Sequence, residues 1–322
     1  MNLRTTSFAF AAALLASSSA YAIDRNVPAP YSTVQSAIDA AQSGDTVRIG
    51  PGVYEEAVSL TKSGISIVGG KNVVVRTMTL SGANGTFIKK VAFGGVQTAV
   101  TVQTSHGVTF KGCEFGLGEF GLAVDGSSDL VVLKCLFAAF TDTALRLNNS
   151  PDAEIIKSVF ADNDLHSIAL LASDAGLVHA NVFAGAGIVW THASDGVAVM
   201  ENVLKNSSIL YTSSTGALVM GNVIKNGVFG YSIYFVNTDD SAIAGNKIKG
   251  GQDHGIIIHQ STNNMIIGNK LKKPGALGIR VTEGGNTFQD NVVKKSGSFD
   301  IYDEAGAGAN TYIGNKYKST NL

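Results

Sequence analysis

The sequence predicts an all-β protein, a single-stranded right-handed parallel β-helix (solenoid) of about 11 or more rungs with a short N-terminal capping helix. Two observations predict this fold. A strand motif returns roughly every 22 residues, and no period holds an amphipathic helix of about ten residues. The composition agrees, because 37 glycines and 5 prolines among many β-branched residues suit short strands joined by tight turns.

The motif is apolar-x-apolar, a small polar residue, a variable residue and a bulky apolar residue. The small polar position falls at Val91, Cys113, Cys135, Ser158, Asn181, Asn202, Asn222, Asn246, Asn269, Asn291 and Asn315. The bulky position two residues later holds Phe93, Phe115, Phe137, Phe160, Phe183, Leu204, Ile224, Ile248, Leu271, Val293 and Tyr317. Parallel strands stack about 4.8 Å apart, so equivalent residues form columns. We expect an interior aromatic ladder and a ladder of hydrogen-bonded side-chain amides.

Cys113 and Cys135 occupy the amide column on adjacent rungs, and the chain has no other cysteine. A disulfide suits an extracellular protein. Stacked parallel Cβ vectors are, however, not the preferred disulfide geometry. A bridge and two buried free thiols both remain open at this point.

The first 22 residues differ from the rest of the chain. Arg4 precedes a short apolar run, Phe8 to Ala16, and Ala20-Tyr21-Ala22 has the small-x-small pattern of a cleavage site. We therefore expect a signal peptide cleaved after Ala22 and a secreted or periplasmic protein. No later stretch has the roughly eighteen uninterrupted apolar residues of a membrane span. The predicted divisions are a signal peptide over 1–22, an N-terminal cap with the first strands over 23–62, and the β-helix over 63–322.

A helix is expected at the start of the cap. Residues 31–41 have helical spacing, with Val34, Ala37, Ile38 and Ala41 on one face. Residues 46–49 and 53–56 are predicted strands on either side of the turn Gly50-Pro51-Gly52. A solenoid needs its apolar end covered, and this helix is the predicted cover.

Residues Thr33 to Glu56, TVQSAIDAAQSGDTVRIGPGVYEE, resemble the opening of extracellular proteins of the pectin-lyase-like superfamily of right-handed parallel β-helices. The later rungs, for example DHGIIIHQSTNNMIIGN (Asp253 to Asn269), are similar to the carbohydrate-binding and sugar-hydrolase repeats of alginate C5-epimerases and NosD-type periplasmic proteins. The resemblance covers nearly the whole mature chain. The D-P-H segment of the epimerases, the Q-D-T-L and D-F-I-F-G segments of pectin methylesterases and the spaced calcium-binding aspartates of pectate lyases do not occur here. The resemblance therefore supplies no catalytic residue, and calcium is not indicated.

An outward column lies three residues after the amide column. It changes from small residues to lysine: Gly94, Gly116, Ala138, Ala161, Ala184, Lys205, Lys225, Lys249, Lys272, Lys294 and Lys318. Six lysines on consecutive rungs would form a stripe about 24 Å long, and like charges so close repel rather than stabilise. We expect a binding surface for an anionic, uronate-containing polysaccharide, with substrate-binding residues Lys205, Lys225, Lys249, Lys272 and Lys294. The alternative is solvated lysines that protect the sheet from aggregation. Nucleic acid is not expected, because the chain has a predicted signal peptide and few aromatics between its basic residues.

A second outward face gathers residues able to carry out chemistry. Four adjacent rungs are expected to bring five side chains together beside the lysines: Tyr234, His254, His259, Arg280 and Tyr302. Cleaving or epimerising a uronate needs a cation for the carboxylate, a base for the C5 proton and a proton donor. Arg280 is the candidate cation, His259 or His254 the base, and Tyr234 or Tyr302 the donor. Glu283 is the only carboxylate expected near Arg280. The alternative is a set of ordinary exposed residues whose tyrosines stack on sugar rings.

The sequence thus predicts a secreted β-helix protein that acts on an anionic polysaccharide as a lyase or C5-epimerase. A non-catalytic polysaccharide-binding protein and a structural β-solenoid are the alternatives. No His, Cys and Asp cluster has metal-ligand spacing, so no cofactor is expected. The last rung lacks an obvious capping helix, so we expect a monomer or a homo-oligomer that pairs through its C-terminal end. The working face is expected on the rungs from about Asn202 onward.

Overall fold

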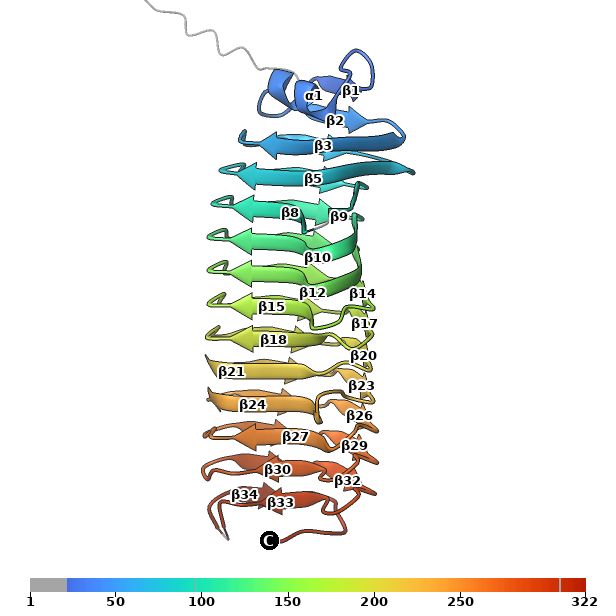
Figure 1. The fold of residues 1–322 in the computed structure, drawn as a ribbon. Helices are drawn as coiled ribbons and strands as arrows, with labels where there is room; N and C mark the ends of the chain where they lie inside the picture. Colours follow the sequence, from blue (N-terminus) through green and yellow to red (C-terminus); the bar gives the residue numbers. More distant parts are fainter. Residues whose placement is uncertain (1–21, 96, 307) are drawn as a thin grey trace, which may run out of the picture.

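The computed structural model describes residues 22–95, 97–306 and 308–322. Within these ranges the strands stack into a parallel β-solenoid of about 13 turns, with one short helix at its N-terminal end (Figure 1). The predicted fold class is confirmed. The predicted signal peptide and its cleavage site lie, apart from Ala22, outside the described residues and stay predictions.

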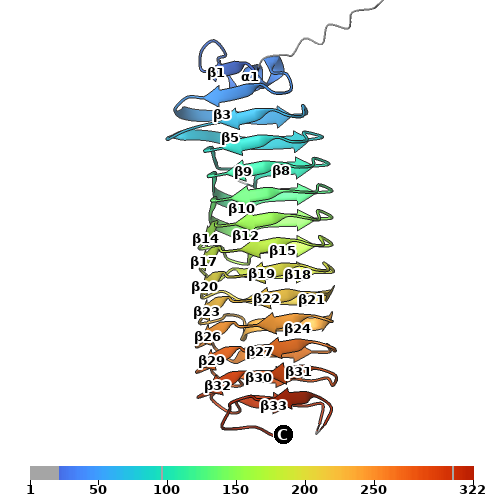
Figure 2. The ribbon, with the colours of Figure 1, turned by 180° about the vertical axis from the view of Figure 1, so that it is seen from behind.

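Three sets of parallel strands run along the solenoid. The back sheet, seen from behind in Figure 2, has 14 strands in the order β1 (Asp24–Val27), β2 (Thr46–Ile49), β4 (Ser66–Val68), β6 (Phe87–Lys89), β9 (Thr109–Lys111), β11 (Val131–Leu133), β13 (Glu154–Ile156), β16 (Leu177–His179), β19 (Ala198–Met200), β22 (Leu218–Met220), β25 (Ala242–Ala244), β28 (Met265–Ile267), β31 (Thr287–Gln289) and β34 (Thr311–Ile313). The flank strands are β7 (Ala92–Phe93), β14 (Val159–Ala161), β17 (Val182–Ala184), β20 (Val203–Lys205), β23 (Val223–Lys225), β26 (Lys247–Lys249), β29 (Lys270–Lys272) and β32 (Val292–Lys294). The front strands are β3 (Gly52–Leu60), β5 (Val73–Ser81), β8 (Thr98–Gln103), β10 (Glu114–Asp125), β12 (Leu136–Asn148), β15 (His166–Leu171), β18 (Ile188–His192), β21 (Ile209–Thr215), β24 (Tyr231–Asp239), β27 (His254–His259), β30 (Ile279–Val281) and β33 (Ile301–Asp303). Of these, β5, β10 and β12 are long enough to pair with both flank and front strands.

The core is a column of inward side chains from each set. Three-residue strands of the back sheet and the flank bury their central residue, such as Ile243 in β25 and Ile248 in β26. The predicted aromatic ladder is confirmed: Phe93, Phe115, Phe137, Phe160 and Phe183 stack with successive ring centroids 5.4, 4.4, 4.9 and 5.0 Å apart. Such stacking adds to the stabilisation that each buried ring provides by leaving water.

The corner between the back sheet and the flank contains the predicted amide ladder, which is also confirmed. Each corner has one residue in the left-handed region, for example Gly245 with φ of 63°, followed directly by the ladder residue. Asn246 shows the pattern. Its Nδ2 donates to the Val219 carbonyl (2.8 Å) and to Asn269 Oδ1 (3.0 Å), and its Oδ1 accepts from the Asn222 backbone N–H (2.9 Å) and side-chain Nδ2 (3.0 Å).

A second ladder, which the sequence analysis did not predict, forms the corner between the front and the back sheet. Its hydroxyls each accept the backbone N–H of the equivalent residue one turn earlier and donate to the carbonyl two residues before, as Ser150 does with Ser127 (3.2 Å) and Asn148 (2.8 Å). The members are Ser105, Ser127, Ser150, Ser173, Ser194 and Ser214. Both corners therefore satisfy their buried backbone groups with side chains.

Cys113 and Cys135 are both buried free thiols on adjacent turns. The neighbouring Cys113 thiol, together with burial, raises the pKa of Cys135. The alternative of two buried thiols that fill the ladder is the one observed.

The helix α1 (Val34–Ala40) covers the N-terminal end of the solenoid and is shorter than the predicted span of 31–41. Thr33 is the N-cap of this helix, and its side chain accepts a hydrogen bond from the Ser36 N–H in a capping box. Lys62 Nζ donates to carbonyls at the other end of the helix. Among the described residues no helix has the length and apolar character needed to cross a membrane.

Candidate functional site

The predicted lysine column lies on the flank, in register. Lys205 pairs with Lys225, and the pairing continues through Lys249 and Lys272 to Lys294. All five are exposed, and none forms an ion pair within the described part of the chain. Four steps of about 4.8 Å give a column about 19 Å long, and each charge lies within a Debye length of its neighbours. The five lysines thus act as one line of positive charge.

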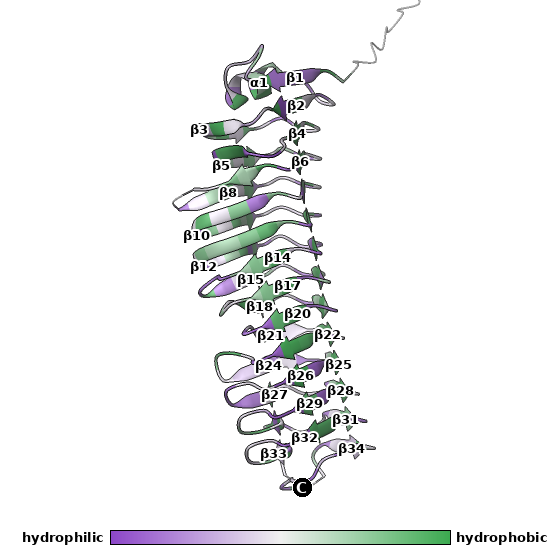
Figure 3. Cartoon of the chain, turned by 90° about the vertical axis from the view of Figure 1, so that its right-hand side faces the viewer, coloured by the Kyte–Doolittle hydropathy of each residue, from purple (hydrophilic) through white to green (hydrophobic). Residues whose placement is uncertain are grey.

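The flank changes character along the axis (Figure 3). Up to the first lysine strand, the column two residues earlier on the same face is apolar and exposed, with Leu136, Val159, Val182 and, beside Lys205 in β20, Val203 between 37% and 42% accessible. That column becomes Lys247 and Lys270 further along. Lys318, the sixth lysine of the predicted column, lies beyond β32 and outside the strands, with its backbone N–H donating to Asp300.

The predicted reactive residues lie on the front strands. Tyr234, Ile257, Arg280 and Tyr302 are successive register partners and form one outward column. His254 and His259, however, begin and end β27, so their backbones lie about 16 Å apart. The expectation that all five candidates share one neighbourhood is therefore wrong for this pair of histidines.

Arg280 is already paired. Its Nε donates to Glu304 Oε1 at 2.7 Å, and this bond raises the pKa of Arg280. The expectation that Glu283 is the only nearby carboxylate is wrong, because the chain brings Glu304 back from the turn after β33. Glu304 therefore competes with a substrate carboxylate for Arg280.

The two histidines have different surroundings. Burial and the charge of Arg280 lower the pKa of His254, which favours a neutral imidazole near pH 7. Its Nδ1 is buried and has no hydrogen-bond partner among the described residues. His259 Nδ1 lies 3.0 Å from Thr282 Oγ1, and its ring lies 6.4 Å from that of Tyr234. Of the two histidines, His254 is the one whose pKa is lowered by the charge of Arg280.

The lysine column and the reactive column lie on different faces. The lysines end flank strands such as β26, and the chain then passes through a loop, residues 250–253 in that turn, before the next front strand begins. Figures 1 and 3 show the two sets side by side around this corner. The loops enclose a hollow of about 340 Å³ lined by Asn206, Asn226, Gly227, Val228, Gly251 and Gln252. The two groups of residues do not line one strip of sheet.

One turn of the front face, at β15 and β18, departs from regular register. Val189 and Thr191 in β18 are both fully buried. Trp190 and His192 point outward instead. A register irregularity between His166 and Ile168 shifts the count by one residue. Trp190 stacks on His166 with centroids 5.0 Å apart, and its Nε1 donates to Thr212.

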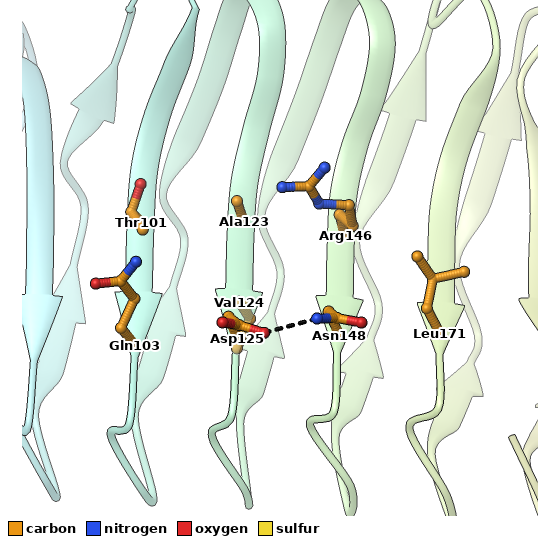
Figure 4. Close-up of a pocket in the computed structure, with 8 residues that line it drawn as sticks. All are labelled: Thr101, Gln103, Ala123, Val124, Asp125, Arg146, Asn148 and Leu171. Atoms are coloured by element: carbon orange, nitrogen blue, oxygen red, sulfur yellow. Dashed lines mark hydrogen bonds between the residues drawn. The ribbon is translucent and has the colours of Figure 1, made fainter.

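A hollow of about 400 Å³ opens on the front face at β8, β10, β12 and β15, nearer the N-terminus than the expected working rungs (Figure 4). It is lined by Thr101, Gln103, Ala123, Val124, Asp125, Arg146, Asn148 and Leu171. Asn148 Nδ2 donates to Asp125 Oδ1 at 2.7 Å. The Arg146 guanidinium lies 4.6 Å from the centroid of the Phe120 ring. Arg146 is not among the site residues expected from the sequence.

Comparisons with known proteins agree with this architecture. A family model described as "Right handed beta helix region" matches residues 61–224, more than half of the chain. A model described as "Periplasmic copper-binding protein (NosD)" matches residues 184–321. A search of curated proteins finds no match.

Solved structures share the fold at low sequence identity. The catalytic unit of a thermostable GH87 alpha-1,3-glucanase from Streptomyces thermodiastaticus strain HF3-3 has a TM-score of 0.73 at 17% identity, over 89% of this chain and 66% of that one. The A-module of a mannuronan C-5 epimerase from Azotobacter vinelandii has a TM-score of 0.58 at 16% identity, over 88% and 90%. A surface protein and adhesin of Streptococcus pneumoniae has a TM-score of 0.58 at 14% identity, over 77% and 94%. The chain thus spans just under two thirds of the glucanase catalytic unit.

The repeat, the parallel strands and the family match lead to one conclusion. This chain belongs to the right-handed β-helix family.

Proposed function

We propose that this β-helix binds an acidic polysaccharide along the lysine column of its flank. The observation that carries the proposal is the in-register alignment of five exposed lysines, Lys205 to Lys294, without carboxylate partners among the described residues. A flat row of regularly spaced cations suits an extended polymer that carries regularly spaced carboxylates. Binding of this kind needs no catalytic group.

Protection from aggregation explains the lysines less well. Lysine blunts a strand edge, but β23, β26 and β29 are paired with a strand on each side and have no free edge. The N-terminal part of the same flank also exposes Val159 and Val182 without any lysine in the strand. The fold therefore tolerates an apolar flank, and the switch to lysine calls for another reason.

The similar proteins support a carbohydrate ligand. One solved structure is named as a glucanase and another as a mannuronan C-5 epimerase. A further glucanase structure is a complex with nigerose. The predicted signal peptide and the periplasmic family name agree with a compartment where such polymers occur.

The test measures affinity for alginate and polygalacturonate, with a neutral glucan as control polymer. The variant K225E/K249E/K272E should bind the acidic polymers about 100-fold more weakly, since three modest attractions become repulsions. The matched control K90E/K134E/K157E has the same charge change at exposed lysines of the corner that precedes the ladder. Equal losses in both variants, or no loss in the first, would refute the proposal.

A lyase or C5-epimerase is the second candidate, favoured by the neutral form of His254 beside Arg280. In this reaction the uronate carboxylate takes the place of Glu304 on Arg280, and His254 removes the C5 proton. Tyr234 or Tyr302 then donates a proton to the leaving oxygen or to the opposite face of C5. A lyase would produce an ultraviolet-absorbing unsaturated uronate, and an epimerase would exchange the C5 proton with solvent deuterium. Absence of both across the same polymers would reject this candidate and leave the binding proposal intact.

Metal chemistry has no part in either candidate. One matching family model is named for copper binding. Within residues 22–95, 97–306 and 308–322, however, no three His, Cys, Asp or Glu side chains are grouped to hold a metal ion. The donor arrangement does not fit a resident metal of that kind, and no step uses one.

A further inference from the structure

We propose that the front-face hollow around Arg146 is a separate binding site for one acidic sugar unit, whose carboxylate or sulfate group pairs with the Arg146 guanidinium. The site, drawn in Figure 4, is formed by front strands β8 to β15, whereas the lysine column lies on flank strands β20 to β32. It rests on the proposed function for the class of ligand, an acidic saccharide. Its residues and its test are independent of the lysines.

Small residues create the space beside Arg146. Along the outward column, Arg146 pairs with Ala123 on one side and with Ala169 on the other, and Thr101 follows Ala123. Because the alanine side chains on each side are small, they leave open space on both sides of the Arg146 side chain. The hollow of about 400 Å³ lies within the usual range for ligand pockets, roughly 300–1,000 Å³.

Among the residues that the structure describes, Arg146 is the front-face arginine without an ion-pair partner. It forms no ion pair within the described residues, whereas Arg280 on the same column is bonded to Glu304. Figure 4 shows its guanidinium turned toward Ala123 and away from Asp125. The Phe120 ring supports the guanidinium at 4.6 Å, which limits its freedom before a ligand arrives. A half-buried, pre-oriented planar fork suits the two oxygens of a carboxylate or sulfate.

The opposite side of the hollow suits hydroxyl groups. Gln103, Asp125 and Asn148 occupy the neighbouring outward column on successive turns. Asn148 donates to one oxygen of Asp125, so the amide and the carboxylate hold each other in place. The other oxygen of Asp125 and the two amides can accept from and donate to sugar hydroxyls. The negative charge of Asp125 also repels an anionic group on that side, so the ligand has one orientation.

The same column continues toward a sugar-stacking surface. Beyond Ala169 the next outward residue is Trp190, whose ring is fixed by His166 and by a hydrogen bond to Thr212. An aromatic ring in an outward column offers an apolar face to the next sugar of a chain. A longer acidic oligosaccharide should therefore bind more tightly than a disaccharide, and W190A should remove that gain.

Calorimetric titration with three disaccharides tests the site: one with a uronate carboxylate, one with a sulfate ester and one neutral. The wild-type protein should bind at least one of the acidic disaccharides and discriminate against the neutral one. The two acidic ligands distinguish the two anions. R146A should lose at least about tenfold in affinity, and R146K should lose less, because an ammonium keeps the charge but not the paired donors.

Two controls separate this site from the others. R76A changes an arginine of front strand β5 that is paired with Glu55, and it should keep the disaccharide affinity within about twofold. K225E/K249E/K272E should also leave disaccharide binding unchanged, and R146A should retain polymer binding through the lysines. A folded R146A or R146K that binds like wild type, equal binding of the neutral disaccharide, or an equal loss in R76A would overturn the assignment.

Discussion

The amide ladder allows a stability prediction whose size follows from the hydrogen bonds. In N246A four buried side-chain hydrogen bonds disappear: two donated by Nδ2, to Val219 and Asn269, and two accepted by Oδ1 from Asn222. Each intramolecular hydrogen bond contributes about 0.5–1.5 kcal/mol, and groups left unpaired in the interior cost at least as much. We expect the free energy of unfolding to fall by about 4 kcal/mol.

Serine at the same position should cost less. Ser158 occupies the ladder in the native protein, where its hydroxyl accepts from the Cys135 N–H and donates to the Ile156 carbonyl, both at 3.1 Å. N246S therefore retains one accepted and one donated bond, and its loss should be about half that of N246A. The exposed Asn26 has no side-chain hydrogen bond within the described residues, so N26A should change stability by less than about 0.5 kcal/mol.

Equilibrium urea unfolding followed by far-ultraviolet circular dichroism measures these values. Hydrogen exchange at the Asn222 amide reports the same opening locally, which matters because long solenoids do not always unfold in one step. A cost for N246A below about 1 kcal/mol would refute the hydrogen-bond accounting. So would equal costs for the alanine and serine variants.

Two further predictions concern the core and the response to pH. F160A should lose about 3–5 kcal/mol of stability in thermal and urea unfolding. F160L should lose much less, because Leu204 fills the same column two turns later. Equal losses for F160A and F160L would contradict the stacking account. Burial is the main cause that lowers the pKa of both His166 and His254 below 6.5. The unfolded chain then takes up protons first as the pH falls through 6.5, so stability should decrease below that pH. The double variant H166Q/H254Q should flatten this part of the profile, and an unchanged slope would contradict the assignment.

The parts of the fold set by the repeat were predictable from the sequence. Equal spacing puts Phe137 over Phe160 and Lys249 beside Lys272, because parallel strands in register force equivalent residues into columns. The serine ladder follows the same rule. It was missed because serine is common in turns and its column, unlike the asparagines, has no distinctive residue type.

The candidate site was less predictable because it depends on the loops between flank and front. These loops differ in length from turn to turn, and a register irregularity after His166 reversed the inward and outward positions at Val189 and Trp190. Residue spacing alone also does not predict that a loop separates the lysines from Arg280. Nor does it predict that Glu304 forms an ion pair with Arg280. The hollow at Arg146 depends on two alanines in an outward column, and small residues there carry no sequence signature.

The most direct test of the central claim is to observe the lysines themselves while an acidic oligosaccharide binds. The lysine side chains would be ¹³C-methylated and followed by NMR, with assignments from single Lys-to-Arg variants. The account predicts that a saturating oligouronate shifts the signals of Lys205, Lys225, Lys249, Lys272 and Lys294, and leaves those of Lys90, Lys134 and Lys157 unchanged. Shifts confined to lysines outside the column, or no shift at any lysine while the ligand binds, would contradict it.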